Sequence, residues 1–239
     1  MSVINIEFAI QHFPDVLKGV PITLTIAVVS MIFGCIFGLL MALCRIYKIP
    51  VLNGLSKLYI SFIRGTPLIV QLYVFFYGVP VLFDFINDAF HTSFNADNIP
   101  PLVYAFIAYT INTTAYQAEI LRSAIIAIGV SQMEAAHAVG MTTAQGLRRI
   151  ILPQAFLIAL PDLANTFIML IKATSVAFAV KVVEILGIAK IIANDGYRFL
   201  EMYLVASIIY WMLCIIFEFL FAKMEKKMRR FNPDAEHAA

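Results

Sequence analysis

The sequence predicts an all-α polytopic membrane protein with about five transmembrane helices. Of its 239 residues, 62% are hydrophobic and only 13% are charged, and the mean hydropathy is +0.88. Soluble domains are about 45–50% apolar and about 25% charged, so this chain needs a bilayer as its solvent. Its apolar residues also fall into runs of about 20 or more, the length that a helix needs to cross the hydrocarbon core.

The predicted elements follow from these runs. Residues 1–21 carry apolar side chains, such as Phe8, Phe13 and Val16, among polar neighbours and are expected to form an amphipathic extracytoplasmic lead-in. A transmembrane domain is expected over 22–222, followed by a basic cytoplasmic tail at 223–239. Within this domain, the expected spans are 22–43, 58–83, 102–121, 156–180 and 202–221. A re-entrant or interfacial helix is expected at 183–192.

Three local patterns qualify these spans. Gly34 and Gly38 are one turn apart in the first span, which either allows close helix contact or reflects the general frequency of glycine in membrane helices. The run 64–67, Arg-Gly-Thr-Pro, interrupts the second span. The three cysteines lie in or beside apolar runs and are expected to be packing residues rather than disulfide or metal ligands: Cys35, Cys44 and Cys214.

The distribution of basic residues predicts the orientation of the chain. Cytoplasmic loops carry an excess of Lys and Arg. The loops after the first and third spans and the tail are basic, whereas 84–97 is acid-leaning and 181–201 is mixed. The N-terminus is therefore expected outside the cell, and the loop 122–155 and the C-terminus are expected in the cytoplasm. The basic residues of these two loops and of the tail are Arg45, Lys48, Lys57, Arg122, Arg148, Arg149, Lys223, Lys226, Lys227, Arg229 and Arg230.

One polar, helix-forming stretch, 134–153, separates the third and fourth spans. Glu134, Ala135 and Ala136 favour a short helix, and Gly140 is expected to end it because glycine adopts the left-handed conformation readily. A second helical run follows, and Pro153 is expected to end it. Glu-Ala-Ala, then Gly, then Ile-x-Leu-Pro resembles the signature loop of ABC-importer permeases.

The resemblance implies that this stretch is a cytoplasmic coupling helix that docks on an ATPase subunit. Glu134 would meet basic groups of the ATPase, Ala135 and Ala136 would allow close packing, and Gly140 would turn the chain back. His137 lies one turn from Glu134 and is expected to hydrogen-bond it, as a structural histidine rather than a pH sensor. The implied coupling residues are Glu134, Ala135, Ala136, His137 and Gly140.

The resemblance extends over most of the chain. The stretches 62–72, 115–122, 152–165 and 172–175 are similar, in order and spacing, to the polar amino-acid (histidine/glutamate/glutamine/arginine) subfamily of binding-protein-dependent transport inner-membrane components. This implies the type I ABC importer permease (MetI-like) fold. Residues 45–50 and 197–211 look most like cystine permeases. The chain departs from the family pattern at Ser131, at Ser123 with Ala124, and at Ala173, and the last departure puts details of the substrate path in doubt.

Charged and polar residues within spans are costly, so they indicate a functional path. A polar cavity could pass a zwitterion, with carboxylates attracting its ammonium group and Lys172 or Arg64 its carboxylate. The alternative for Arg64 and Glu119 is solvation near the cytoplasmic interface. Asp162 and Asn165 are further polar candidates, with Asp162 expected near the cytoplasmic mouth. The predicted substrate-path residues are Arg64, Gln71, Asn112, Glu119, Lys172 and Ser175.

The sequence contains no Gly-x-x-x-x-Gly-Lys-Ser/Thr loop, so ATP would be used by a partner chain, and no cofactor, catalytic residue or metal site is predicted here. The resemblance implies a subunit of the bacterial cytoplasmic membrane that is not an enzyme. The implied partners are ATPase subunits, an extracytoplasmic amino-acid-binding protein, a second permease subunit (itself or a paralogue) and membrane lipid. Nucleic acid is not among them. L-cystine is the leading candidate for the transported substrate. The alternatives are an ATPase-independent secondary transporter or channel, which predicts inverted repeats, and a membrane-embedded enzyme.

Overall fold

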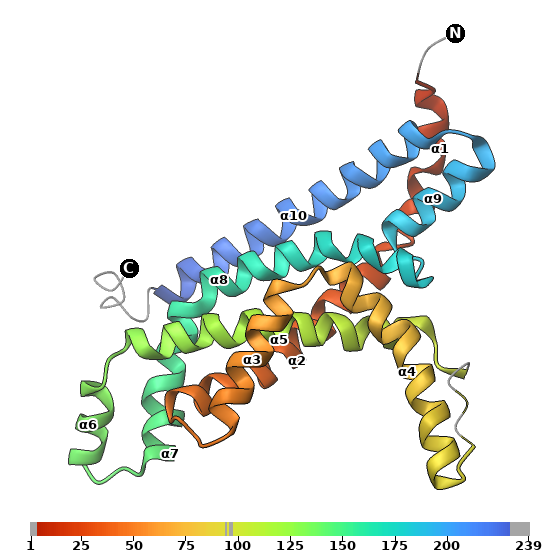
Figure 1. The fold of residues 1–239 in the computed structure, drawn as a ribbon. Helices are drawn as coiled ribbons and strands as arrows, with labels where there is room; N and C mark the ends of the chain where they lie inside the picture. The colour runs from red at the N-terminus through yellow and green to blue at the C-terminus, as the bar shows by residue number, and fades with distance from the viewer. Residues whose placement is uncertain (1–3, 94, 96–97, 230–239) are drawn as a thin grey trace.

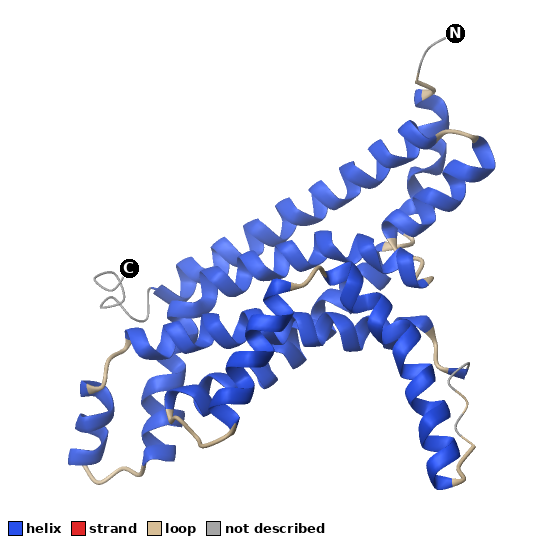
Figure 2. Cartoon of the chain, viewed as in Figure 1, coloured by secondary structure: helices blue, strands red, loops and turns tan. Residues whose placement is uncertain are grey.

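The computed structural model describes residues 4–93, 95 and 98–229, and within these ranges every regular element is helical (Figures 1 and 2). The predicted all-α class is therefore confirmed. Asp97 of the acid-leaning segment and residues 230–239 of the basic tail lie outside the described residues, whereas 223–229 form the end of the last helix.

The centre of the bundle is the pair α2 (Val20–Ile46) and α5 (Pro101–Ala127). A Cβ atom on Gly34 would lie 2.7 Å from the Thr113 side chain, and one on Gly38 would lie 2.8 Å from the Gln117 side chain. Real Cβ atoms do not approach so closely, so only glycine allows this helix spacing. The close contact that the two glycines could indicate is confirmed.

The second predicted span is two helices rather than one. α3 (Leu52–Gly65) ends at Thr66, and α4 (Leu68–Phe90) begins after Pro67. The interruption at 64–67 is confirmed, because Thr66 and Pro67 both have extended backbone. The expected end at 83 is wrong, since α4 continues to Phe90 and carries the first acidic residues of the expected loop. Figure 1 shows α4 leaving the bundle at a steep angle to α5.

The stretch after α5 begins with α6 (Ser131–Ala138), as expected. The helices α7 (Thr143–Gly146), η2 (Leu147–Ile151), α8 (Leu152–Ala173) and η3 (Thr174–Val180) then follow one another without a break. The expectation that Pro153 ends the second run is wrong. Pro153 stands in the first turn of α8, directly after the π-helical η2, where a missing N–H disrupts least.

At the opposite end from α6, two short helices pack against the start of a long one (Figure 1). They are α1 (Ile6–Leu17), α9 (Ile185–Gly196) and α10 (Phe199–Arg229). Val16, Ile185 and Met202 are fully buried where the three meet. The Asn5 backbone N–H donates to Glu201 Oε1 at 3.0 Å, which ties the start of α1 to α10. α9 confirms the helix expected near 183–192.

Four described helical segments are long and apolar enough to cross a membrane: 20–46, 68–90, 143–180 and 199–228. α5 has 27 residues, as many as α2, but it is more polar than the four segments. It lies at the centre of the bundle, and much of its length is buried. Its neighbours therefore shield it from lipid. The turn between α2 and α3, helix α6 and the end of α10 all lie at one end of the molecule (Figure 1), which we call the α6 end.

Candidate coupling helix and transport face

α6 projects from the rest of the bundle (Figure 1). Glu134 and Ala135 are exposed, whereas Ala136 is only 1% exposed. A Cβ atom on Gly146 would lie 3.2 Å from Ala136 Cβ and 2.8 Å from Met133 Sδ, so α6 packs on α7 through small residues. Ala136 therefore supports α6 from within the chain, and Glu134 and Ala135 form the surface that a partner could reach.

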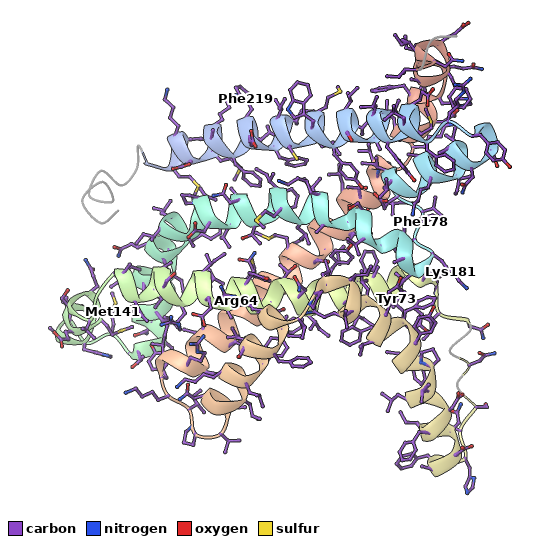
Figure 3. All side chains as sticks on the ribbon, turned by 45° about the horizontal axis from the view of Figure 1, so that its top comes forward. Arg64, Tyr73, Met141, Phe178, Lys181 and Phe219 are labelled. Atoms are coloured by element: carbon purple, nitrogen blue, oxygen red, sulfur yellow. The ribbon has the colours of Figure 1, made fainter. Side chains whose placement is uncertain are left out.

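The turn after α6 is defined by local hydrogen bonds. Gly140 has a φ of 79°, which confirms the left-handed position expected there, and the Met141 N–H donates to the Ala136 carbonyl at 3.0 Å. His137 Nδ1 lies 3.1 Å from the Met141 carbonyl oxygen. The expected bond from His137 to Glu134 is therefore replaced by one that closes the turn, where Figure 3 labels Met141.

The turn leads directly into a long helical segment. Thr142 and Gln145 form a reciprocal capping box: the Gln145 N–H donates to Thr142 Oγ1 at 3.3 Å, and the Thr142 N–H donates to Gln145 Oε1 at 2.9 Å. From this start the chain stays helical to Val180. A displacement of α6 is thus connected through α7 and η2 to the membrane-spanning α8.

One face of α8 is exposed and carries several polar side chains. Asp162, Asn165, Met169 and Lys172 follow one another at spacings of three or four residues, and all four are exposed. The opposite face packs into the core through residues such as Ile171. A stripe of carboxylate, amide and ammonium groups in a membrane-spanning helix is unstable against lipid and needs a polar environment.

Two predicted path residues, Gln71 and Asn112, hold the break between α3 and α4 against α5. Gln71 Nε2 donates to the Ile63 carbonyl at 2.9 Å and to Thr66 Oγ1 at 2.8 Å, and its Oε1 accepts from Asn112 Nδ2 at 3.0 Å. Gln71 is 4% exposed. These hydrogen bonds satisfy the polar backbone that Pro67 leaves unpaired within the fold.

Three other predicted path residues also have contacts within the chain. Glu119 accepts from Arg45 on α2 and from Arg122, whose Nη2 lies 2.9 Å from Glu119 Oε2. The Arg64 guanidinium lies over the Tyr116 ring, 5.3 Å from its centroid. Ser175 Oγ donates to the Lys172 carbonyl at 2.8 Å. Glu119 and Arg64 are thus brought together near the α6 end, and Lys172 and Ser175 lie on the exposed side of α8 and η3.

A buried carboxyl group that the sequence did not single out lies near α9. Glu184 is fully buried, caps α9 by accepting from the Gly187 N–H at 3.0 Å, and also accepts from the hydroxyls of Thr23 and Tyr210. Burial raises the pKa of Glu184, and the hydrogen bonds from its neighbours partly oppose that shift. Glu184 therefore joins α2, α9 and α10. Thr23 and Tyr210 lie 161 and 26 residues away in the sequence, so no local pattern could reveal these two contacts.

The described residues contain no group of three or more His, Cys, Asp or Glu side chains that could hold a metal ion. The described cysteines Cys35, Cys44 and Cys214 are free thiols.

A bundle of membrane-spanning helices, a polar face along one of them and a projecting helix at one end define a membrane transport subunit. The chain belongs to the family described as binding-protein-dependent transport system inner membrane component, which matches residues 34–230.

Similar proteins agree with this assignment. The probable amino-acid permease protein YxeN of Bacillus subtilis is 43% identical over 96% of this chain and 98% of its own length. The L-cystine transport system permease protein TcyL of the same organism is 37% identical over 91% of this chain and 88% of its own. A solved amino acid ABC transporter, described as crystallised with histidines, has a TM-score of 0.78 and 31% identity over 95% of this chain and all of its own.

A solved MetNI methionine ABC transporter shares the fold, with a TM-score of 0.65 and 22% identity over 89% of this chain and 95% of its own. Together with the closer structure, it confirms the predicted type I ABC importer permease (MetI-like) fold.

Proposed function

We propose that this chain is the permease subunit of an ABC importer that moves a polar L-amino acid across the bacterial cytoplasmic membrane, driven by separate ATPase subunits. The observation that carries the proposal is the exposed α6, with Glu134 and Ala135 on its surface, followed by a short turn and then by a helical segment, 143–180, that contains the polar face of α8. The names of its relatives, which are amino-acid permeases, support the substrate class.

The proposed orientation places the N-terminus outside and the C-terminus in the cytoplasm. The positions of the basic residues support this orientation. Arg45, Lys57 and Arg122 belong to helix segments near the α6 end, and the cations of α10 lie at the same end. This orientation puts α6 in the cytoplasm, where an ATPase subunit can reach it.

The coupling is proposed to be mechanical. Glu134 binds basic groups of the ATPase, and Val130 and Val139, which are 78% and 73% exposed, supply apolar contact beside it. When the ATPase subunits close, α6 moves with them, and the segment that begins at Thr142 transmits the motion to α8. The substrate path then switches between inward and outward access as a rigid-body transition.

The substrate path is proposed to follow the polar face of α8. Lys172 attracts the carboxylate of the amino acid at one point of the path. Asp162, about 15 Å away along the helix at 1.5 Å per residue, attracts its ammonium group at another point. A second permease subunit, itself or a paralogue, covers this face and keeps lipid away from it. Gln71, Asn112 and Ser175 are proposed to hold the backbone around the path. Arg64 and Glu119 are proposed to lie beside its cytoplasmic approach.

L-cystine is the proposed substrate, delivered by an extracytoplasmic binding protein. Two L-cystine permeases of Bacillus subtilis, TcyL and TcyB, are each 37% identical to this chain. Competition of labelled cystine uptake by unlabelled cystine, arginine, glutamine and histidine tests this choice. Cystine should compete best, and stronger competition by arginine or histidine would replace it as the substrate.

The coupling claim is tested with Glu134→Lys in vesicles that contain the chain and its ATPase subunits. Reversing the charge of an exposed contact should abolish most uptake and weaken co-purification of the ATPase, while the fold stays intact because Glu134 is exposed. Glu7→Lys, the same charge change on exposed α1 at the opposite end, is the control. Normal uptake by Glu134→Lys would refute the coupling role of α6.

A further inference from the structure

A second polar site lies at the α6 end, on the flank of α3. Side chains of α2, α3 and α5 line an open, shallow pocket of about 480 Å³. Its polar lining consists of Arg45, Lys57, Ser61, Arg64 and Glu119. Three cations thus converge on one carboxylate, so the pocket carries a net positive charge. Figure 3 shows Arg64 where α3 lies across α5.

The single carboxylate of the pocket is already neutralised. Glu119 is bonded to Arg45 inside the pocket and to Arg122 beside it. Within the described part of the chain, neither Lys57 nor Arg64 makes a salt bridge, and Arg45 Nε is buried without a hydrogen-bond partner. The pocket therefore offers two positive charges without a salt bridge, those of Lys57 and Arg64, to an external anion.

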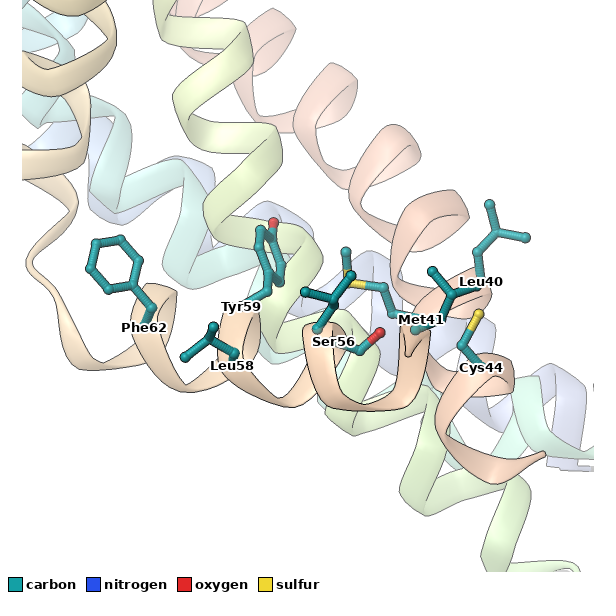
Figure 4. Close-up of a pocket in the computed structure, with 9 residues that line it drawn as sticks. Leu40, Met41, Cys44, Ser56, Leu58, Tyr59 and Phe62 are labelled. Atoms are coloured by element: carbon teal, nitrogen blue, oxygen red, sulfur yellow. The ribbon is translucent and has the colours of Figure 1, made fainter. Parts of the chain in front are cut away.

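The flank of α3 next to this pocket is apolar and exposed. Leu58 and Phe62 are 67% and 64% exposed. They border a second hollow of about 660 Å³ between α3 and α2, lined almost entirely by apolar side chains such as Leu40 and Met41 (Figure 4). Ser61 in the basic pocket lies one helical turn from Leu58, so the polar and apolar sites meet along one face of α3.

We propose that this composite site binds one anionic phospholipid, with its phosphate held by Lys57, Arg64 and Ser61 and an acyl chain lying over Leu58 and Phe62. The inference rests on the proposed orientation, which places the site in the cytoplasmic leaflet. Basic pockets between helices at that surface attract anionic headgroups. Arginine and lysine bind phosphate through charge-assisted hydrogen bonds. The apolar surface beside the cations can bind an acyl chain, so the site favours a lipid over a free anion.

The bound lipid would connect three helices that reach the α6 end separately. α3 contacts the core through Ile60 and Ile63 but exposes most of its remaining surface. A lipid whose phosphate is held by Lys57 and Arg64 and whose acyl chain lies over the hollow between α3 and α2 adds a contact between these helices close to α5. We expect the lipid to stabilise the end of the molecule on which the ATPase acts.

The test is native mass spectrometry of the full chain in detergent, titrated with phosphatidylglycerol or with phosphatidylcholine. Wild type should retain one phosphatidylglycerol preferentially. Lys57→Gln with Arg64→Gln should weaken this binding roughly thirtyfold, which is about 2 kcal/mol at about 1 kcal/mol for each basic residue. Ser61→Glu, which adds a carboxylate at an exposed position and removes no cation, should abolish it.

The control is Lys223→Gln with Lys226→Gln, which removes two exposed cations from α10 at the same end of the molecule. It should keep the preferential lipid. Equal loss in the control would reduce the effect to general surface attraction, and unchanged binding in Lys57→Gln with Arg64→Gln would overturn the site. Displacement of the lipid by inorganic phosphate alone would identify a free-anion site instead.

The proposed orientation can fail separately from the lipid site. A membrane-impermeant thiol reagent should label Gly54→Cys from the cytoplasmic side, because Gly54 is exposed on α3 near the pocket. Labelling from the outside would overturn the orientation, and the lipid measurement in detergent would still report on the pocket.

Discussion

Gly38 determines how closely the two central helices approach. Any side chain there meets the Gln117 side chain at 2.8 Å and the Ala118 backbone nitrogen at 2.9 Å. Gly38→Leu should therefore lower the free energy of unfolding by about 1–3 kcal/mol or more, the usual cost of overpacking. Thermal unfolding of the full chain in detergent measures this.

Gly54→Ala is the matched control, because a Cβ atom at Gly54 has nothing within 4 Å. Alanine also favours a helix over glycine by up to about 1 kcal/mol, so this variant should unfold at the same temperature as wild type or slightly higher. Equal thermal midpoints for Gly38→Leu and wild type would contradict the close packing of α2 and α5.

Glu184 should make stability depend on pH. Burial raises its folded-state pKa above the ordinary value of about 4.3, which applies to the unfolded chain. Its contribution to stability is therefore complete below that ordinary pKa and is lost as the pH rises through the folded pKa. Glu184→Gln removes the titration, so the thermal midpoint of the variant minus that of wild type should increase with pH from about 4.3 upward. A constant difference would show that Glu184 does not titrate there.

The charge of Glu119 within a span is visible in the sequence, but its partner is not. Arg45 is 74 residues away and becomes a neighbour only because α2 and α5 pack side by side. The same reason hides the contacts of Glu184 with Thr23 and Tyr210. Side-chain types and spacing can identify costly groups, whereas the groups that neutralise them depend on tertiary packing.

At the scale of the element, α6 depends on the small residues beneath it. Gly146→Leu would push against Met133 and Ala136 and displace α6 from α7. ATP-driven uptake should fall several-fold, because a coupling helix needs a fixed position to transmit motion. Ala144→Leu, at an exposed position of α7, should have little effect. Equal uptake by both variants in vesicles with the ATPase would indicate that the position of α6 is unimportant.

The elements were predictable where the local signal was strong. Gly140 ended α6 as expected, because its left-handed backbone suits glycine, and Thr66 with Pro67 separated α3 from α4. Pro153 was misleading, because proline is unfavourable inside a helix but acceptable in its first turn. The sequence does not reveal that a π-helical segment, η2, joins α7 to α8 at this point.

At the scale of the whole molecule, hydropathy predicted the membrane class and most of the spans, because the bilayer imposes a length and a polarity on each helix. α5 was found as an apolar run between polar flanks, although its polar residues keep it below the hydropathy of the other spans. The steep departure of α4 was not predictable, since the angle depends on packing at the break after Gly65. The exposed polar face of α8 likewise emerges only when the buried face is known.

The central claim is that this chain is driven by ATP hydrolysis in a separate subunit. The most direct measurement is amino-acid uptake into vesicles that contain the chain, its binding protein and either an active ATPase or one that binds ATP without hydrolysing it. Uptake is expected with the active ATPase only, and none from an ion gradient alone. Uptake that persists with the inactive ATPase, or that follows a proton or sodium gradient, would identify a secondary transporter instead.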